Sequence, residues 1–473
     1  MECVNMTRGL AADADITGLA ADSRKIEPGF LFAALAGANI DGSDFIDDAV
    51  ARGAAAVLAA PGAQLDGVPL FTHAEPRRRY AEIAARFYGA QPDHIAAVTG
   101  TNGKSSVADF ARQLWTHLGL KAASLGTLGL VAPGRIEAGK LTTPDAADLH
   151  ATLAALANDG VDHAAIEASS HGLDQFRLDG VRISVAAFTN ISRDHLDYHG
   201  TMDAYRDAKA RLLNELLQDG GTAVLNADDP YSKRLLGGRD VQTLTYGKAG
   251  KDIRLLDCQP HSQGQRIKLN LMSKDAEIDF PLIGDFQVMN ALCALAMVIA
   301  DGADPQAVLQ GIEKMEPVGG RMQLAARLQN GAAVYVDYAH TPDALQRLLE
   351  ALRPHTEAAL SVVFGCGGDR DIGKRPEMGA IAHRLADHVI VSDDNPRSED
   401  AGQIRAAILA AATGASEISA REDAIFEAVR GLATGDILVI AGKGHEQGQI
   451  IGGKTIPFDD VEVAVRAAAE VDQ

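Results

Sequence analysis

The chain has 473 residues, enough for about three domains at roughly 150 residues each. With 47% hydrophobic and 23% charged residues, its composition is globular and excludes a disordered or fibrous protein. The formal net charge of −20 disfavours free nucleic acid or an anionic membrane surface as a general partner, so an anionic ligand needs a local concentration of Arg, Lys or backbone N–H groups.

The sequence predicts a cytoplasmic protein. No basic segment followed by an apolar run opens the chain, so we expect no signal peptide. The most apolar stretch, 291–300, is too short to cross a bilayer. The cysteines lack CxxC spacing, which predicts neither a disulfide framework nor a cysteine-based zinc site; they are Cys3, Cys258, Cys293 and Cys366.

The first 88 residues predict a small α/β domain. Short apolar runs such as 30–35 and 54–58 are punctuated by Gly and Asp. A predicted helix over 77–88 ends at Gly89, and Pro92 follows, which places a domain boundary at 88/89.

The next part of the chain, 89–318, predicts a mostly parallel sheet with helices on both faces. This follows from the alternation of strands and helices. The strands are expected over 95–98, 164–166 and 185–188, and the helices over 104–117, 146–156, 202–217 and 291–300. Polar and apolar residues alternate over 267–271, which predicts a small antiparallel piece.

From residue 332 the alternation restarts and predicts a third, Rossmann-like domain over 319–473. The boundary falls between 317 and 331, and we place it at 318/319. The strands are expected over 334–336, 361–364, 389–391 and 437–440. The fold class is therefore α/β with three domains.

A glycine-rich turn, TGTNGKSS over 99–106, connects the first central strand to the helix over 104–117. Glycines let the backbone curl so that N–H groups and the helix N-terminus face an anion, and a lysine adds charge against phosphates. The spacing is GxxGKS rather than GxxxxGKS, and an ordinary glycine-rich turn is the alternative. The pattern favours nucleotide binding by Gly100, Thr101, Asn102, Gly103, Lys104, Ser105 and Ser106.

Further blocks resemble the Mur ligase family, and within it the MurE type. They follow one another in order over nearly the whole chain: EASSHGLDQFR (167–177), TNISRDHLDYH (189–199), YRDAK (205–209), DYAHTPD (337–343), GCGGDRDIGKRP (365–376), DNPR (394–397) and GKGHE (442–446).

The resemblance implies an activity. Such ligases use ATP to add meso-diaminopimelate to the D-Glu carboxylate of UDP-N-acetylmuramoyl-L-Ala-D-Glu through an acyl phosphate, releasing ADP and phosphate in cytoplasmic peptidoglycan precursor synthesis. It implies a uridine-binding first domain, a central P-loop ATPase-like domain and a C-terminal amino-acid-binding domain. The implied partners are these three substrates, with no nucleic acid and no membrane insertion, and the protein is expected to be a monomer.

Four residues are expected to be catalytic: Lys104, Glu167, His195 and Lys209. Ser105 and Glu167 offer the hard oxygen ligands that Mg²⁺ prefers. By resemblance alone, His195 is a further metal ligand, and Lys209 carries a CO₂-derived carbamate that serves Mg²⁺. The alternatives are a hydrogen-bonded glutamate at a strand end, a loop histidine, and a lysine on a solvated or salt-bridged helix face.

The resemblance also assigns nucleotide and UDP-substrate contacts. Asn290, Arg321 and Asp337 are expected at ATP, with His340 in the same loop as Asp337. The expected UDP-substrate residues are Ser23, Thr142, Thr143, Ser169, Gln175 and Arg177. Arg177 is the expected anchor for anionic groups. A second uridine-contacting loop covers 38–42, where Ala38 replaces a histidine often seen in the family.

The DNPR block is the most informative about the amino acid. Meso-diaminopimelate differs from lysine by a distal carboxylate, which an arginine fork can pair with bidentately. Lysine would leave that arginine buried and unpaired, which gives strong discrimination. The expected diaminopimelate-binding residues are Arg370, Asp394, Asn395, Pro396, Arg397, Gly442 and Glu446.

Two alternatives stay open. Neighbouring Mur ligases and folylpolyglutamate synthetase are also ATP-dependent amide-forming enzymes, although the DNPR block and the first domain favour the MurE type. A nucleotide-binding regulatory module without ligase activity predicts loss of Glu167, Lys209 or Arg397, and all three are present.

Overall fold

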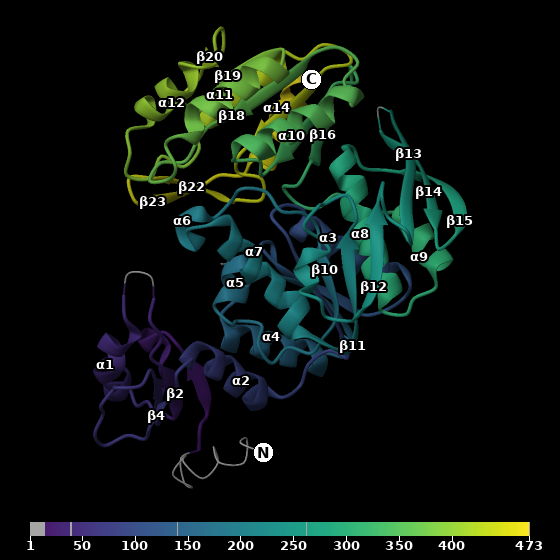
Figure 1. The fold of residues 1–473 in the computed structure, drawn as a ribbon. Coiled ribbons are helices and arrows are strands. Elements are labelled where there is room, and N and C mark those ends of the chain that lie inside the picture. The colour runs from purple at the N-terminus through teal and green to yellow at the C-terminus, as the bar shows by residue number, and fades with distance from the viewer. Residues whose placement is uncertain (1–14, 38–39, 140, 262, 473) are drawn as a thin grey trace. The chain divides into compact units, whose positions relative to one another are not determined.

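The computed structural model describes residues 15–37, 40–139, 141–261 and 263–472 (Figure 1). Cys3, Ala38 and the start of the chain, on which sequence-based predictions rest, lie outside these residues. The chain divides into two compact units, Met1–Thr245 with Ala296–Ala303, and Tyr246–Leu295 with Asp304–Gln473. The predicted domain limits at 88/89 and 318/319 stay predictions. Cys258, Cys293 and Cys366 are free thiols.

The beginning of the first unit is a small α/β module, as predicted. Its four strands are parallel and lie in chain order: β1 (Gly18–Ala20), β2 (Phe30–Ala33), β3 (Ala56–Ala59) and β4 (Leu70–Thr72). The helices are α1 (Ile46–Ala51) and α2 (Pro76–Tyr88), and α2 packs Tyr80, Ala81 and Ala84 into the core. Proline at the first helical position and Gly89 after the last set the limits of α2.

The central sheet of the first unit has the strand order β12-β11-β10-β5-β9-β6-β7-β8. Its parallel pairs join β5 (His94–Thr99) to β9 and β10, β6 (Ala122–Gly126) to β9 (His163–Glu167), and β10 (Ile183–Phe188) to β11 (Leu217–Asn226). β7 (Gly129–Ala132) and β8 (Arg135–Glu137) form an antiparallel edge. The mostly parallel sheet is confirmed, and it brings the carboxyl ends of β5, β9 and β10 to one edge, where α/β proteins bind ligands.

Helix limits agree with the sequence in some places and differ in others. α3 (Lys104–His117) has the predicted limits, and α4 (Ala146–Asn158) is two residues longer than predicted. The helix predicted over 202–217 is confirmed to within one residue, although its geometry changes: α7 (Met202–Arg211) passes into a π-helical turn, η4 (Leu212–Leu216), and Leu217 pairs with Ile183 of β10. The predicted start of the apolar helix at 291 is wrong, because α8 (Asp285–Ala300) begins just after Gly284.

The second unit begins with the predicted antiparallel piece. β12 (Gln242–Gly247) leads the chain into it, and Tyr246 and Gly247 pair with β13 (Ile253–His261). β13, β14 (Gly264–Leu271) and β15 (Lys274–Phe280) form a meander. Ile267, Leu269 and Leu271 of β14 are buried, which explains the alternation in the sequence. α9 (Pro305–Ile312) follows α8.

The rest of the second unit is the predicted Rossmann-like fold. Its sheet has the order β16-β17-β21-β18-β19-β20 and is parallel apart from β16. The strands are β16 (Gln323–Arg327), β17 (Ala333–Asp337), β18 (Leu360–Phe364), β19 (His388–Val391), β20 (Ser416–Glu417) and β21 (Ile437–Ala441). The hairpin β22 (Gly448–Ile451) and β23 (Lys454–Pro457) follows.

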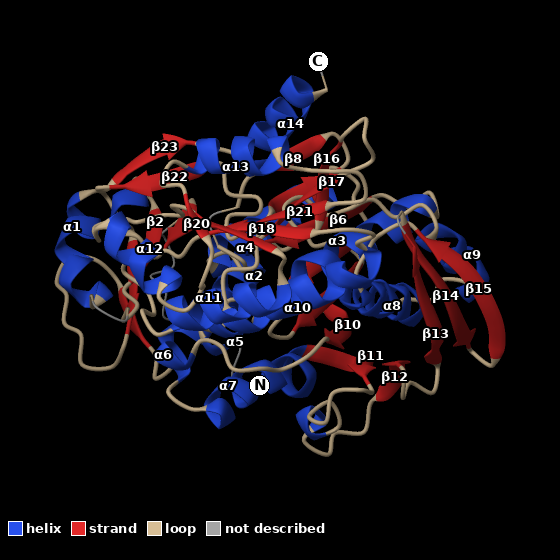
Figure 2. Cartoon of the chain, turned by 90° about the horizontal axis from the view of Figure 1, so that it is seen from above, coloured by secondary structure: helices blue, strands red, loops and turns tan. Residues whose placement is uncertain are grey.

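Helices cover both faces of this sheet (Figure 2). Tyr335 of β17 faces a core shared with α10 (Pro342–Leu352), α11 (Lys374–Leu385) and α12 (Ala401–Leu409). Its neighbours Val334 and Val336 face a second core with α13 (Arg421–Arg430) and α14 (Asp460–Val471). Within the described residues, no helix is long and apolar enough to cross a membrane.

Candidate active site

The glycine-rich turn adopts a conformation that only glycine permits at two positions. Gly100 has φ 150°, and a Cβ there would lie 1.9 Å from Thr189 Oγ1. Gly103 caps α3 in the left-handed region at φ 89°. The loop therefore leads from the carboxyl end of β5 straight into a helix N-terminus, which is a geometry that binds phosphate.

Residues after β10 hold this loop in place. Thr101 N donates to Asn190 O at 2.8 Å, and Asn102 N donates to Asn190 Oδ1 at 3.1 Å. Thr189 Oγ1 donates to Asn102 O at 2.7 Å. The sequence analysis gave Thr189 and Asn190 no role, although both belong to a block that resembles the family. Their contacts hold the backbone of the loop in this shape.

Two lysines converge on the loop. Lys104 Nζ donates to Gly100 O and Thr101 O, both at 2.9 Å, and Lys209 Nζ donates to Gly100 O at 2.7 Å. Gly100 O thus accepts hydrogen bonds from the side-chain nitrogens of both lysines. The structure brings together these two predicted catalytic residues, which come from different helices.

Lys209 is buried, with 1% of its surface exposed, so it is not a lysine on a solvated helix face. Burial, and then the charge of Lys104, lower its pKa well below the ordinary value, while Asp194 opposes the shift. Its Nζ also lies 4.5 Å from the ring centroid of Tyr205. The environment therefore favours a neutral amine at position 209.

Glu167, the last residue of β9, is buried and receives several hydrogen bonds. Its Oε2 accepts from Ser105 Oγ at 3.0 Å, and its Oε1 accepts from Thr127 N at 2.7 Å. A Cβ at Gly126 would lie 2.0 Å from Oε1, so glycine is required there. The hydroxyl of Ser105 and the carboxylate of Glu167 are hard oxygen ligands side by side, and this donor set fits Mg²⁺. Thr127 was missed by the sequence analysis.

His195 lies in a cluster of rings. It adopts φ 51°, and its ring centroid lies 4.8 Å from that of His171 and 6.2 Å from that of Tyr205. Burial lowers the pKa of His195, with Lys104 and Lys209 adding to the effect and Asp194 opposing it. The pKa of His171 falls to about 4, mainly through burial. Both shifts favour the neutral imidazole, which is the form that binds a metal.

The predicted UDP-substrate residues of the central domain form one network. Thr143 Oγ1 donates to Glu167 O at 2.7 Å and accepts from Ser169 N at 3.0 Å. Arg177 donates to Thr143 O and to Gln175 Oε1, both at 2.7 Å. Thr142 joins through Thr127, with 2.9 Å between their hydroxyl oxygens. Ser23 is buried in a 3₁₀ turn, η2 (Ser23–Lys25), after β1.

In the second unit, the predicted diaminopimelate residues after β19 meet those after β21. Asn395 Nδ2 donates to Glu446 Oε2 at 2.9 Å, and Asn395 Oδ1 accepts from Ile450 N at 2.9 Å. A Cβ at Gly442 would lie 2.7 Å from Asp394 Oδ2. The loop that contains Pro396 is thus fixed on two sides.

Arg397 is held at its backbone and its side chain. Its N donates to Ile450 O at 3.0 Å, and its Nη1 donates to Gly368 O at 2.8 Å, at φ 53°. The side chain is half-buried, whereas Arg370 is exposed. Hydrogen bonds from Ser398 lower the pKa of Asp369, and Arg397 and Arg370 both add to this shift, so the two arginines influence the same carboxylate.

Lys443 is a residue of this site that the sequence analysis missed. It is fully buried, and its Nζ donates to Asn395 Oδ1 at 3.2 Å, Glu446 Oε2 at 3.0 Å and Gly448 O at 2.6 Å. The signal was present in the GKGHE block, where Gly442 and Glu446 were assigned but the lysine between them was not. Lys443 fixes the orientation of Asn395 and Glu446.

The predicted ATP residues of the second unit also gather. Asp337 accepts from Met322 N at 2.7 Å and Ala339 N at 2.8 Å, and burial raises its pKa while Arg321 opposes the shift. The Arg321 guanidinium lies 4.6 Å from the centroid of the Tyr338 ring. Asn290 and His340 form hydrogen bonds with nearby residues of the chain. Asn290 Nδ2 donates to Gln287 Oε1 at 3.0 Å, and His340 Nδ1 lies 2.9 Å from Tyr338 O.

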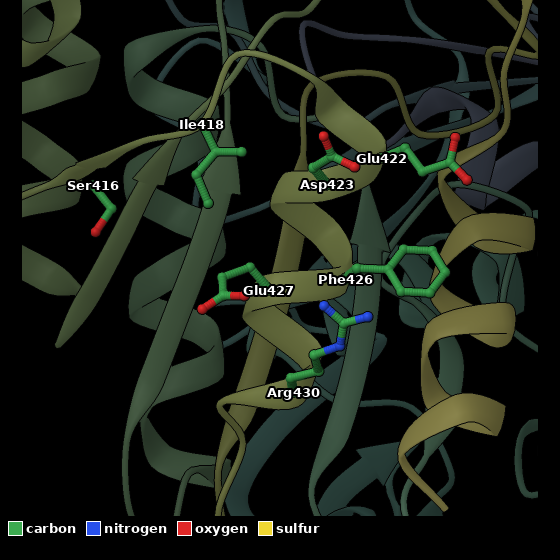
Figure 3. A pocket seen from close by; sticks show the side chains of 7 residues that line it. All are labelled: Ser416, Ile418, Glu422, Asp423, Phe426, Glu427 and Arg430. Atoms are coloured by element: carbon green, nitrogen blue, oxygen red, sulfur yellow. The ribbon is translucent and has the colours of Figure 1, made fainter. Parts of the chain in front are cut away.

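A separate hollow of about 630 Å³ lies beside α13 (Figure 3). Three carboxylates surround it together with Phe426 and Arg430, and its lining residues are Ser416, Ile418, Glu422, Asp423, Phe426, Glu427 and Arg430. These residues are different from every predicted site residue, so this hollow is not the candidate active site.

The fold and the phosphate loop define a nucleotide-binding α/β protein, and comparison with known families identifies it as a ligase. The Mur ligase family catalytic domain matches residues 15–92, the Mur ligase middle domain matches 98–298, and the Mur ligase glutamate ligase domain matches 320–444. The chain belongs to the Mur ligase family. The resemblance predicted from the motifs, and the α/β fold with it, are confirmed.

Individual relatives carry a more specific name. UDP-N-acetylmuramoyl-L-alanyl-D-glutamate–2,6-diaminopimelate ligases from Caulobacter vibrioides and Agrobacterium fabrum are 52% and 50% identical to this chain. The first match covers 98% of both chains, and the second covers 97% of this chain and 94% of the relative. A solved structure of a ligase with this name is 37% identical, covers 96% of this chain and 94% of its own, and has a TM-score of 0.71.

Proposed function

We propose that this chain is an ATP-dependent ligase that joins meso-diaminopimelate to the D-Glu carboxylate of UDP-N-acetylmuramoyl-L-Ala-D-Glu in cytoplasmic peptidoglycan precursor synthesis. The observation that carries this proposal is the identity of 50–52% with named relatives over at least 97% of the chain. The phosphate loop and the loop over 394–397 offer the groups that this reaction needs. The predicted domain limits would divide the chain into uridine-binding, ATP-binding and amino-acid-binding parts, acting as a monomer.

Amide formation from a carboxylate needs a leaving group better than oxide. A D-Glu carboxylate oxygen attacks the γ-phosphorus of ATP, the bond to ADP breaks, and an acyl phosphate forms. The diaminopimelate amine then attacks the acyl carbon, phosphate leaves, and the nitrogen loses a proton. Lys104 and the N–H groups of the loop balance the phosphate charge, and oriented binding of two reactants contributes up to about 7–11 kcal/mol.

The donor set of the first unit fits Mg²⁺. Ser105 and Glu167 would hold one ion, and His195 with a carbamylated Lys209 would hold another. When bound, Mg²⁺ neutralises phosphate charge that would otherwise repel the attacking carboxylate. Asn290, Arg321, Asp337 and the loop over 100–106 would contact ATP.

We also propose the carbamate on Lys209. A neutral amine attacks CO₂, a C–N bond forms, and one proton leaves to solvent, so a carbamate anion replaces the amine. The lowered pKa of Lys209 supports this step because an ammonium has no lone pair for it. The negative carbamate would attract the positive charge of Lys104, whereas a protonated Lys209 would repel it.

The two remaining substrates have separate sets of residues. Arg177, with Thr142, Thr143, Ser169 and Gln175, would bind the anionic UDP-substrate, and Ser23 would contact its uridine side. Arg397 would bind the distal carboxylate of diaminopimelate, Arg370 would bind a further carboxylate, and Glu446 would bind an ammonium group. Asp394 and Asn395 would complete this site, on a loop shaped by Pro396 and Gly442.

The test is ligation by the purified full-length chain. The assay supplies UDP-N-acetylmuramoyl-L-Ala-D-Glu, ATP, Mg²⁺ and bicarbonate, and compares ADP release with diaminopimelate, lysine, glycine and D-Ala-D-Ala. We expect diaminopimelate to give the highest rate and to join the UDP-dipeptide as a radiolabel. A faster reaction with another amine would contradict the assigned amino acid, and ATP binding without ligation would favour a regulatory module.

A further inference from the structure

Two histidines meet at the amino-terminal edge of the central sheet, away from the phosphate loop. His94 is the first residue of β5 and His163 is the first of β9, and the two are direct partners in the parallel register. Their rings stack with centroids 4.4 Å apart and an interplanar angle of 3°. Because β5 continues to Thr99, roughly 17 Å of strand separates His94 from the loop, at about 3.3 Å per residue.

Asp301, just after the end of α8, completes this cluster. Its Oδ1 lies 2.9 Å from His94 Nδ1, and its Oδ2 lies 3.4 Å from His163 Nε2. One ligand atom from each of the three residues lies within 4.8 Å of the others. The side chains of Asp301 and His163 are only 5% and 9% exposed, whereas that of His94 is 44% exposed.

The surroundings of Asp301 favour a bound cation. The buried carboxylate of Asp301 is faced by the two imidazoles, and the C-terminal end of a helix adds partial negative charge beside it. A divalent cation at the cluster would offset both negative charges and would connect the end of α8 to the starts of two strands.

Asp162 lies next to one ring nitrogen of His163. Its Oδ1 is 2.9 Å from His163 Nδ1, and when Nδ1 carries the proton of this hydrogen bond, Nε2 on the Asp301 side is the nitrogen left to bind a metal. Metal-binding histidines commonly donate their other ring N–H to a carboxylate in this way. Asp162 is thus a positioning residue for His163.

A hollow of about 300 Å³ opens onto the cluster. His94 and Asp301 line it together with polar residues of the first unit, including Ser184, Gln218, Thr222 and Gln242. This opening supplies the entry path that a metal site needs and room for a water molecule as a further ligand.

We propose that His94, His163 and Asp301 form a metal site separate from the ligase site, for a borderline divalent transition metal of the Zn²⁺ type. Two imidazole nitrogens, one carboxylate oxygen and one water give the four ligands that Zn²⁺ takes. Mg²⁺ prefers oxygen ligands and is not the ion for this site. The alternative occupant is a proton shared among the three side chains, without a metal.

The test uses the full-length chain, stripped with a chelator and then kept in excess Mg²⁺ so that oxygen-ligand sites are filled. Co²⁺ is titrated as the probe. We expect the visible absorption of four-coordinate Co²⁺ to saturate at one equivalent and to disappear on addition of Zn²⁺. His94→Gln should weaken Co²⁺ binding at least tenfold, and Asp162→Asn, which keeps all three ligands, should weaken it about tenfold.

His195→Gln, at the other edge of the sheet in the predicted ligase metal site, tests whether Co²⁺ binds there instead, and it should leave the Co²⁺ absorption unchanged. Zn²⁺ should also raise the melting temperature of the wild type but not of His94→Gln, which should fold because His94 is half-exposed. Absence of the absorption, or its loss in His195→Gln but not in His94→Gln, would overturn the proposal and leave the shared proton.

Discussion

Replacing Arg397 with lysine should reduce the use of diaminopimelate far more than the binding of ATP. Arg397 Nη1 donates to Gly368 O at 2.8 Å, so the guanidinium is anchored while its other nitrogens can face a carboxylate. Lysine has one nitrogen and cannot serve both partners with the same fixed geometry. Loss of one charge-assisted hydrogen bond costs about 1.5–3 kcal/mol, which corresponds to a loss of roughly 10- to 150-fold in kcat/KM for diaminopimelate.

The assay is steady-state ADP release with diaminopimelate varied at saturating ATP, and then with ATP varied. Arg430→Lys is the matched control, because Arg430 forms an exposed ion pair with Glu470 on α14. We expect the KM for ATP to be unchanged in both variants. Equal kcat/KM for diaminopimelate in the wild type and Arg397→Lys would refute the fork, and a parallel loss in Arg430→Lys would show a general effect.

Three further predictions concern Lys209, Gly100 in the phosphate loop, and His445. Lys209→Ala should abolish ligation with no rescue by bicarbonate, measured as radiolabel transfer; full activity would exclude a role for a carbamate. Gly100→Ala should weaken ATP binding more than tenfold in calorimetry, because its Cβ would lie 1.9 Å from Thr189 Oγ1, whereas Gly431→Ala, with its nearest atoms at 3.6 Å, should bind normally. Burial lowers the pKa of His445 to about 4. In the unfolded chain His445 becomes protonated near pH 6.5, whereas in the folded chain it becomes protonated only near pH 4. The free energy of unfolding therefore falls as the pH drops through this window. His445→Gln should show a smaller fall in melting temperature between pH 7 and pH 5, and an identical fall would contradict this assignment.

The elements that were predicted well have local causes. Gly100 and Gly103 mark the turn, and α3 begins at Lys104 as expected because the signals for its start lie within a few residues. The Rossmann-like sheet was predictable from its apolar runs, since its strands are buried on both faces by two helical layers.

The elements that were missed depend on distant parts of the chain. Strand β11 (Leu217–Asn226) was not predicted: its first residue, Leu217, pairs with Ile183 directly after the helical segment ends at Leu216. Thr127 reaches Glu167, 40 positions away, only because β6 lies beside β9. The motif was enough to predict a role for Glu167, but only the order of the strands shows that Thr127 is its hydrogen-bond partner.

The two buried lysines show how similar side chains are prepared for different tasks. Lys443 Nζ lies 3.0 Å from the carboxylate of Glu446 and also contacts an amide and a carbonyl oxygen, so its charge is matched and its position is fixed. Lys209 instead donates to the carbonyl of Gly100 and shares that oxygen with Lys104. Burial, and then the charge of Lys104, lower the pKa of Lys209, and the proposed carbamate would replace this amine with an anion that pairs with Lys104. This asymmetry is why Lys209 is the lysine that we expect to be modified, and Lys443 the one that orients its neighbours.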